Sequence, residues 1–253
     1  MRLSGQTLSV DAKVEANSVR AVLFDLGNTL VSYYRAQDFT PILRESITGI
    51  SEFLSEQTSI AVDPDRAFRH ALRLNIEDSN FRVRLLQDRL LEIFRDVPLT
   101  TDTYREISRI FLSPIFRCAM LDPEALPTLA AIRQDGIRTA IVSNTPWGSP
   151  AEQWADELDR HGLNSAVDAV VFCVDVGWRK PAPQIFEHAL SLIGVEAQEA
   201  AFVGDDPHWD ISGAEQVGLR PILLDPRAKS TSGSVQCIRS LKELLPLLHT
   251  GAV

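Results

Sequence analysis

The sequence has little of several features that define broad classes of protein. Its three cysteines, Cys118, Cys173 and Cys237, are odd in number and widely spaced, so neither a disulfide framework nor a cysteine metal or redox motif is expected. No apolar run approaches the length of a transmembrane helix, and the first 19 residues lack the apolar segment of a secretory signal. No internal repeat or low-complexity segment appears. These absences favour a cytoplasmic protein with reduced thiols.

The chain also lacks an excess of basic residues. Its 253 residues carry 25 Lys and Arg against 34 Asp and Glu, for a formal net charge of −9. This balance argues against nucleic acid or an anionic membrane as a general partner. The rest of the composition, 45% hydrophobic and 23% charged, is that of an ordinary globular protein. The sequence is compatible with a monomer and with a homodimer.

The residue pattern changes twice along the chain. Residues 20–33 contain an uninterrupted apolar run, "AVLF" at 21–24, which is typical of a central parallel strand. Residues 34–118 carry apolar side chains at helical spacing, and from residue 119 onward helices alternate with strands. Alternation of this kind predicts βαβ units and a doubly wound parallel α/β core. The expected parts are a flexible tail at 1–19, an α/β core at 20–33 and 119–253, and an all-helical insertion at 34–118.

Individual elements follow from the same patterns. Within the insertion, helices are expected over 36–57, 64–80, 81–97 and 101–116. In the core, strands are expected at 137–144, 165–176, 199–206 and 220–225, and helices at 123–136, 149–162, 182–194, 211–218 and 237–248.

Polar side chains follow the expected core strands. In chain order they are Asp25, Ser143, Lys180 just beyond the third strand, and then Asp205 and Asp206. Because the carboxyl ends of parallel strands meet at one edge of the sheet, these side chains are expected to lie together. A carboxylate nucleophile, a hydroxyl, a cation and an acidic cluster outline a site for phosphoryl transfer.

Four stretches carry a family resemblance: "FDLGNTL", "IVSNT", "GWRKPAPQIF" and "VGDDPHWDISGA". In order and separation they resemble the motifs of the haloacid dehalogenase-like (HAD) superfamily of hydrolases. The resemblance spans nearly the whole chain after the tail. It implies a Rossmann-like core with a helical cap inserted after the first motif. It also implies a Mg²⁺-dependent phosphatase that acts on a small-molecule phosphate through an aspartyl phosphate.

The resemblance implies a role for each matching residue. Asp25 is the expected nucleophile. Ser143 and the backbone N–H of Asn144 are expected to bind the phosphoryl oxygens, and Lys180 to neutralise charge in the transition state. Simpler interpretations exist for each, such as a loop cap for Asp25 or a polar strand end for Ser143. Arg179 is expected to lie on the surface.

The metal site implied by the resemblance consists of Asp25, the carbonyl of Gly27, Asp205 and Asp206, with Asp210 orienting the site from outside the ligand set. Three carboxylates within six residues repel one another unless a cation lies between them, which favours a metal. The simpler interpretation is a group of acids that cap the next helix.

Gly27 stands where most phosphatases of this type carry an aspartate that protonates the leaving group. Loss of a general acid typically lowers a rate by about 10²–10⁴-fold. A preference for stabilised leaving groups, such as those of sugar 1-phosphates or acyl phosphates, is therefore expected. His208 is another candidate proton source, although a loop histidine of this kind is usually exposed.

Other functions within the resemblance are less compatible with the sequence. A haloacid dehalogenase would carry Tyr in place of Gly27 and a non-acidic metal loop, and a phosphonate-cleaving relative would need a Lys in residues 34–118, which contain none. A non-catalytic binding protein is supported by Gly27 alone.

Two sets of side chains are candidates for contacts with the rest of the substrate. Trp147 and Trp178 flank the motifs, where they would line the leaving-group side or simply pack. Arginines of the insertion are candidates for binding a second acidic group, although arginines on such helices are mostly solvated or paired: Arg66, Arg69, Arg73, Arg82, Arg84 and Arg89.

Overall fold

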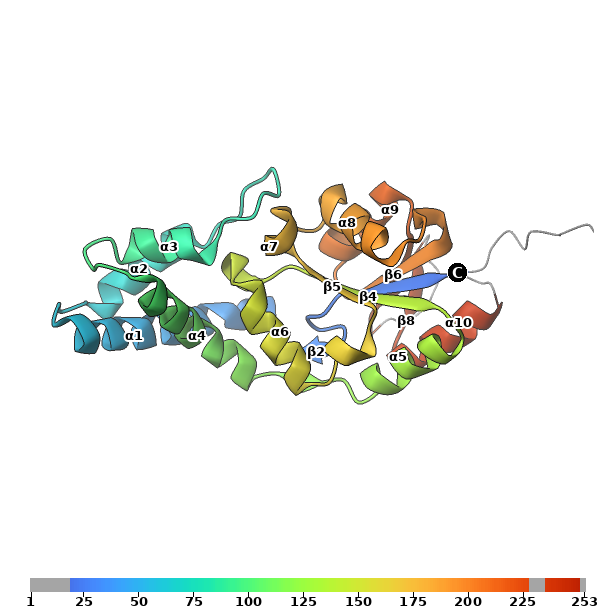
Figure 1. Cartoon of the computed structure of the whole chain (residues 1–253), viewed down its shortest axis with the longest axis horizontal. Helices are drawn as coiled ribbons and strands as arrows, with labels where there is room; N and C mark the ends of the chain where they lie inside the picture. Colours follow the sequence, from blue (N-terminus) through green and yellow to red (C-terminus); the bar gives the residue numbers. More distant parts are fainter. Residues whose placement is uncertain (1–18, 228–234, 251–253) are drawn as a thin grey trace, which may run out of the picture.

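A computed structural model of the chain describes residues 19–227 and 235–250 (Figure 1). The tail expected at residues 1–19 lies outside these ranges except for its last residue. The molecule is elongated, with a sheet flanked by helices at one end and a bundle of helices at the other (Figure 1). Within the described ranges, no helix is both long and apolar enough to cross a membrane.

A six-stranded parallel sheet forms the α/β part. Its strand order is β5-β4-β1-β6-β7-β8, and each neighbouring pair is parallel. The prediction of a doubly wound parallel sheet is thereby confirmed. The strands are β1 (Ala21–Phe24), β4 (Arg138–Ser143), β5 (Ala169–Phe172), β6 (Ala200–Gly204), β7 (Arg220–Leu224) and β8 (Gln236–Ile238).

Helices cover both faces of this sheet, so β1 is buried on both sides. Its side chains alternate: Ala21 and Leu23 belong to one apolar cluster, and Val22 and Phe24 belong to the other. Figure 1 shows α8 and α9 over one face, with α5 and α10 over the other. The core helices are α5 (Ala125–Gln134), α6 (Ala151–Arg160), α7 (Cys173–Val176), α8 (Pro183–Ile193), α9 (Ser212–Val217) and α10 (Leu244–Thr250).

Four helices form the insertion, as predicted. They are α1 (Phe39–Thr58), α2 (Pro64–Leu74), α3 (Leu86–Ile93) and α4 (Thr101–Arg117). The chain leaves and re-enters the core through a short antiparallel ribbon of β2 (Val31–Ser32) and β3 (Met120–Leu121). We call residues 39–117 the cap. Apolar side chains of the cap and of one sheet face belong to a single buried cluster, so the two parts pack against each other.

Three stretches of the chain differ from the predicted elements. The 165–176 strand ends at Phe172, and the following α7 is stopped by Gly177 with φ 76°. The 237–248 helix is wrong at its start, because β8 pairs there with the edge of β7 before α10 begins. Pairing with the preceding strand, β7, outweighed the local helical pattern.

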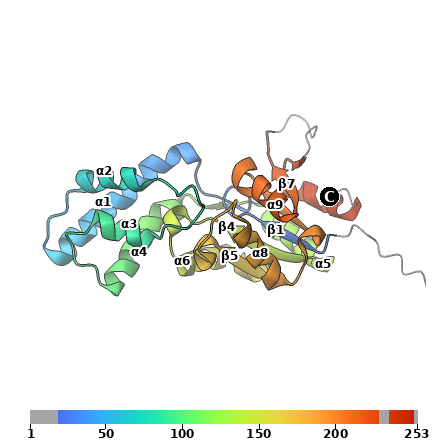
Figure 2. The ribbon, with the colours of Figure 1, turned by 90° about the horizontal axis from the view of Figure 1, so that it is seen from above.

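The third difference lies in the cap, where residues 75–85 are not helical. We call this segment the cap loop. Its backbone bonds to the core: Val83 N–H donates to the Gly177 carbonyl at 3.2 Å, and the Phe81 carbonyl accepts from Arg179 N–H at 3.0 Å. Seen from above, the segment between α2 and α3 reaches back toward the core (Figure 2). These long-range bonds replace the helical ones that the local spacing favours.

Candidate active site

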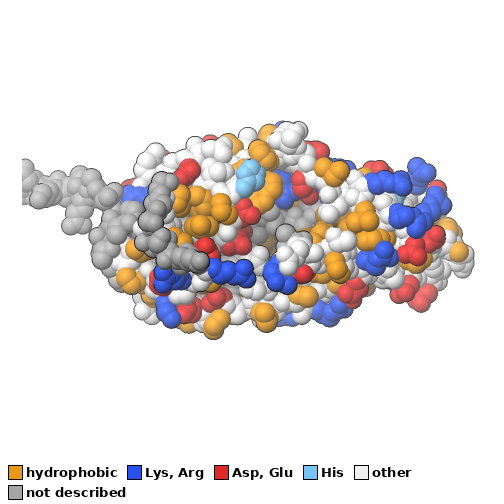
Figure 3. All heavy atoms as spheres, turned by 180° about the vertical axis from the view of Figure 1, so that it is seen from behind, with side chains coloured by type: hydrophobic (Ala, Val, Ile, Leu, Met, Phe, Trp, Pro, Cys, Tyr) orange, Lys and Arg blue, Asp and Glu red, His pale blue; other side chains and the backbone are white. Residues whose placement is uncertain are grey.

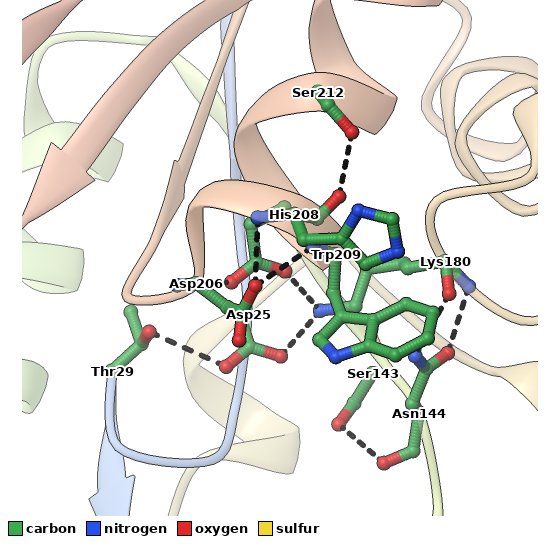
Figure 4. A network of polar contacts seen from close by, with 10 residues as sticks. Asp25, Thr29, Ser143, Asn144, Lys180, Asp206, His208, Trp209 and Ser212 are labelled. Carbon is green, nitrogen blue, oxygen red and sulfur yellow. Dashed lines mark hydrogen bonds and ion pairs between the residues drawn. The ribbon is translucent and has the colours of Figure 1, made fainter.

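The loops at the carboxyl ends of β1, β4 and β6 converge with the segment that precedes α8. Figure 4 shows Asp25, Ser143, Asn144, Lys180 and Asp206 around one centre. The structure therefore brings together side chains that are up to 181 positions apart in the sequence, from Asp25 to Asp206. The expectation that polar strand ends meet is confirmed.

Asp25 follows β1 and is fixed by the turn that succeeds it. Its backbone N–H donates to the Val203 carbonyl at 2.9 Å, which extends the pairing with β6. Thr29 Oγ1 donates to Asp25 Oδ2 at 3.3 Å. The turn also places Asn28 in the left-handed region with φ 59°, which asparagine tolerates better than most residues. Asp25 is 7% exposed, so its carboxylate faces the site in one fixed orientation.

Lys180 lies between two carboxylates. Its Nζ donates to Asp25 Oδ1 and forms an ion pair with Asp210 Oδ1 at 2.7 Å. Burial alone would lower the pKa of Lys180, but the Asp210 and Asp25 carboxylates outweigh it and raise that pKa above its usual range. Lys180 is therefore a permanent cation within the site.

The side chain of Asn144 holds Lys180 in place. Asn144 Oδ1 accepts from Lys180 N–H at 2.8 Å, and Asn144 Nδ2 donates to the Lys180 carbonyl at 3.2 Å. Ser143 Oγ, which is 5% exposed, donates weakly to the Asn144 carbonyl at 3.4 Å. The amide of Asn144 thus links the end of β4 to the segment before α8, a positioning contact that the sequence did not reveal.

Carboxylates gather at the centre of the site. One ligand oxygen from each of Asp25, Asp205 and Asp210 lies within 4.8 Å of the others. Burial raises the pKa of Asp205 to about 6, with a further rise from Asp210. Burial also raises the pKa of Asp25, against the opposing charge of Lys180. Negative charge is costly here, and a bound cation would offset that cost.

Asp206 and Asp210 play different parts in the loop after β6. Asp206 Oδ1 accepts from the N–H groups of His208 and Trp209 at 2.7 and 2.9 Å, and so caps the π-helical turn Pro207–Ile211. That turn brings Asp210 back beneath Gly204, where a Cβ would overlap the Asp210 carboxylate. Asp210 is 1% exposed. It joins the carboxylate cluster directly, whereas Asp206 remains a predicted ligand.

A cavity of about 290 Å³ opens over this centre. The space-filling view shows the surface hollowed where the cap meets the core (Figure 3). Arg179 is one of its lining residues, and the expectation that Arg179 lies on the surface is wrong: its side chain is 15% exposed and pairs with Glu77 of the cap loop at 2.7 Å. No signal within "GWRKP" indicated this pairing, because the partner lies in the cap.

Of the two alternatives for Trp147 and Trp178, lining the cavity or packing, the structure shows packing, and other aromatic residues line the cavity. Tyr33, Tyr34, Trp154 and Trp209 contribute to its wall. Trp147 is buried instead against the cap, where its indole N–H donates to Asn75 Oδ1 at 2.8 Å. Trp178 stacks under Arg82, with the guanidinium carbon 3.9 Å from the ring centroid. His208 is exposed, as expected, and packs on Trp209.

Comparison with known proteins supplies the family. Residues 19–218 match the model of the haloacid dehalogenase-like hydrolases. A ribulose-1,5-bisphosphate 5-phosphatase of Halopiger xanaduensis is 31% identical over 219 residues, which cover 83% of this chain and 86% of that protein. A glyceraldehyde 3-phosphate phosphatase of Methanothermobacter thermautotrophicus is 25% identical over 212 residues, which cover 82% and 86%.

A solved structure shows the same architecture. The crystal structure of a HAD phosphatase from Thermococcus onnurineus matches with a TM-score of 0.64 at 25% identity, covering 90% of this chain and 97% of that one. Motifs, parallel sheet, helical insertion and family model agree over most of the chain. The chain therefore belongs to the haloacid dehalogenase-like hydrolases, and the relatives named above are phosphatases.

Proposed function

We propose that this protein is a Mg²⁺-dependent phosphatase that hydrolyses a small-molecule phosphate ester through an aspartyl phosphate on Asp25. The observation that carries the proposal is the position of the Asp25 carboxylate. It lies at the base of a cavity, in contact with Lys180 and beside Asp205 and Asp210. A fold alone does not require this constellation, so its presence favours catalysis over a purely binding role.

The chain's own residues would act as follows. An oxygen of Asp25 forms a bond to phosphorus while the bond from phosphorus to the leaving oxygen breaks, and water then cleaves the acyl phosphate to return the free carboxylate. Lys180 offsets negative charge on Asp25 and on the phosphoryl oxygens. Ser143 Oγ would turn from its weak bond to the Asn144 carbonyl to donate to a phosphoryl oxygen, assisted by the Asn144 N–H.

The donor set suits Mg²⁺. Hard divalent cations prefer carboxylate and carbonyl oxygens, and Asp25, Asp205 and Asp210 present three such oxygens in one place. The carbonyl of Gly27 and the Asp206 carboxylate would complete the set. When bound, the cation neutralises charge between an anionic nucleophile and an anionic substrate.

The relatives narrow the substrate class. Their names describe phosphates of ribulose and glyceraldehyde, so a phosphorylated sugar or sugar derivative is the class we propose. Within that class, Gly27 leaves the leaving oxygen without the usual acid. Sugar 1-phosphates, whose leaving group is stabilised, are therefore expected to react faster than phosphates of primary alcohols.

Phosphate release from a panel of sugar phosphates and simple alkyl phosphates tests the function. With Mg²⁺ present, turnover of at least one ester is expected, and EDTA should lower it by about 100-fold or more, because charge stabilisation of several kcal/mol is lost. Restoration of activity by added Mg²⁺ is the control for irreversible damage. Undiminished activity in EDTA would contradict the metal dependence. If the folded protein released phosphate from no ester in the panel, a binding role would be favoured.

Replacing Gly27 by Asp tests the account of the missing acid. A Cβ at Gly27 would have its nearest neighbour, Tyr33 Cδ2, at 4.0 Å, so the first carbon of a side chain meets no close contact there. Turnover of alkyl phosphates is expected to rise about tenfold or more, with a smaller gain for sugar 1-phosphates. Gly27→Asn is the matched control, since it fills the same space without a transferable proton. Equal effects of Asp and Asn would contradict the account.

A further inference from the structure

A second charged cluster lies where the cap loop meets the core. Glu77 of the cap loop pairs with Arg179 Nη1 through Oε2 at 2.7 Å and with Arg89 Nη2 of α3 through Oε1 at 2.9 Å. Arg89 Nη1 also donates to the Leu74 carbonyl at 3.1 Å. The cluster thus joins one arginine of the core to one arginine of the cap through a single carboxylate.

The cluster has more positive than negative charge and little contact with water. Exposure is 1% for the side chain of Arg89, 15% for Arg179 and 28% for Glu77. The Nε atoms of both arginines are buried and have no hydrogen-bond partner. Burial lowers the pKa of Arg89, Glu77 opposes this shift, and Arg84 and Arg179 add to it. A buried excess of cationic charge is unfavourable unless an anion compensates it.

Arg179 connects this cluster to the active-site cavity. Among the described residues that line the cavity, Lys180 and Arg179 are the two cations, and Lys180 is already held between Asp25 and Asp210. The Arg179 guanidinium stacks over Trp209, with its carbon 5.1 Å from the ring centroid. The ion pair and the stacking together fix the guanidinium at the cavity wall.

We propose that Arg179 binds a second anionic group of the substrate, carried by the part of the molecule that leaves as the alcohol, and that Glu77 and Arg89 position it. This inference rests on the proposed function and narrows it to diacidic substrates. A guanidinium binds a carboxylate or a phosphate in a bidentate manner. The shared chemistry is therefore a carboxylate or phosphate group separated by a short carbon chain from the phosphate that is hydrolysed.

A set of matched esters distinguishes a carboxylate from a phosphate as the second group. Propyl phosphate, 3-phosphooxypropanoate and 1,3-propanediol bisphosphate each release a three-carbon primary alcohol and differ in the group at its far end. Longer homologues vary the distance to that group. The readout is the kcat/KM of each diacidic ester divided by that of the monoacidic ester of the same length. In the native protein this ratio is expected to reach about tenfold or more at the best length, as for a charge-assisted hydrogen bond. The better of the two arms identifies the group as carboxylate or phosphate.

Arg179→Gln is expected to bring that ratio close to one, mainly through KM. Arg179→Lys should recover part of it, because the charge remains while the bidentate geometry is lost. Arg82→Gln is the matched control: Arg82 neighbours the cluster and stacks on Trp178, but it does not line the cavity, and the ratio should not change. If the Gln variant does not fold, the Lys variant decides.

Two results would overturn the inference: a native ratio near one at every length, or an equal ratio in the native protein and Arg179→Gln. Failure of the proposed function is separate, since it means that the native protein hydrolyses no ester. In that case calorimetric titration of the Asp25→Asn variant with 1,3-propanediol bisphosphate and with propyl phosphate, in Mg²⁺, decides the inference. Tighter bisphosphate binding that is lost with Arg179→Gln supports it, and equal binding overturns it.

Discussion

Asp25→Asn is expected to lower phosphate release under saturating substrate by about 10⁴-fold or more, the scale on which enzymes lose activity with their nucleophile. The amide keeps the shape of the side chain. Its oxygen can accept from Lys180, and its NH2 group can donate to the Thr29 hydroxyl, which also accepts hydrogen bonds, so positioning survives. It cannot form the acyl phosphate. The measurement is a phosphate-release time course at high enzyme concentration, with the ester that the native protein hydrolyses fastest.

The same variant is expected to fold at least as stably as the native protein. Burial raises the pKa of the Asp25 carboxyl. At a pH above the usual pKa of an aspartate, folding therefore carries a free-energy penalty for burying the charged carboxylate. A permanently neutral amide removes that penalty, so the urea midpoint in EDTA should stay level or rise. Asp38→Asn, which removes an exposed carboxylate paired with Arg35 at 2.9 Å, is the matched control and should retain full activity. Residual turnover within an order of magnitude of native would eliminate Asp25 as the nucleophile.

Much of this site could be predicted because parallel sheets place it by rule. An apolar run such as β1 must be buried on both faces, and its carboxyl end must then lie beside those of its neighbours. This logic brought Asp25, Ser143, Lys180 and Asp205 together from sequence alone. This prediction requires only that the strands and turns be recognised in order, and both have recognisable local sequence patterns.

Features that depend on long-range contacts could not be predicted from the order of strands and turns. Arg179 is half of an ion pair whose other half, Glu77, lies in a cap loop that the apolar spacing indicated as helix. Asp210 joins the carboxylates because a π-helical turn carries it back beneath Gly204, whereas the family resemblance implied a place outside the ligand set. In both cases the sequence shows a polar residue, but its contacts depend on backbone that is distant in the sequence or irregular in conformation.

Lys180→Met is expected to lower turnover by about 10³-fold, since the variant loses a preorganised cation at the developing charge. Methionine is close to lysine in length, and the position is 2% exposed, so the cavity is refilled without a void. Lys242→Met is the matched control, because Lys242 pairs with Glu124 at 3.2 Å on the surface and contacts nothing in the site. A loss of less than tenfold would show that Lys180 serves the fold more than the reaction.

The same substitution should make folding depend on the metal. Without Lys180, three carboxylates that share one small volume have no cation between them in EDTA, and removal of one partner of a buried ion pair typically costs about 3–5 kcal/mol. The pKa values of Asp25 and Asp205, which burial already raises, then rise further, so the folded state binds more protons than the unfolded one and stability increases as the pH falls from about 8 to about 6. Mg²⁺ stabilises only the folded state, and it should raise the urea midpoint of Lys180→Met by more than that of the native protein. No Mg²⁺-dependent shift in either protein would show that the cluster binds no metal, and equal shifts would show that Lys180 does not compensate the charge that the metal neutralises.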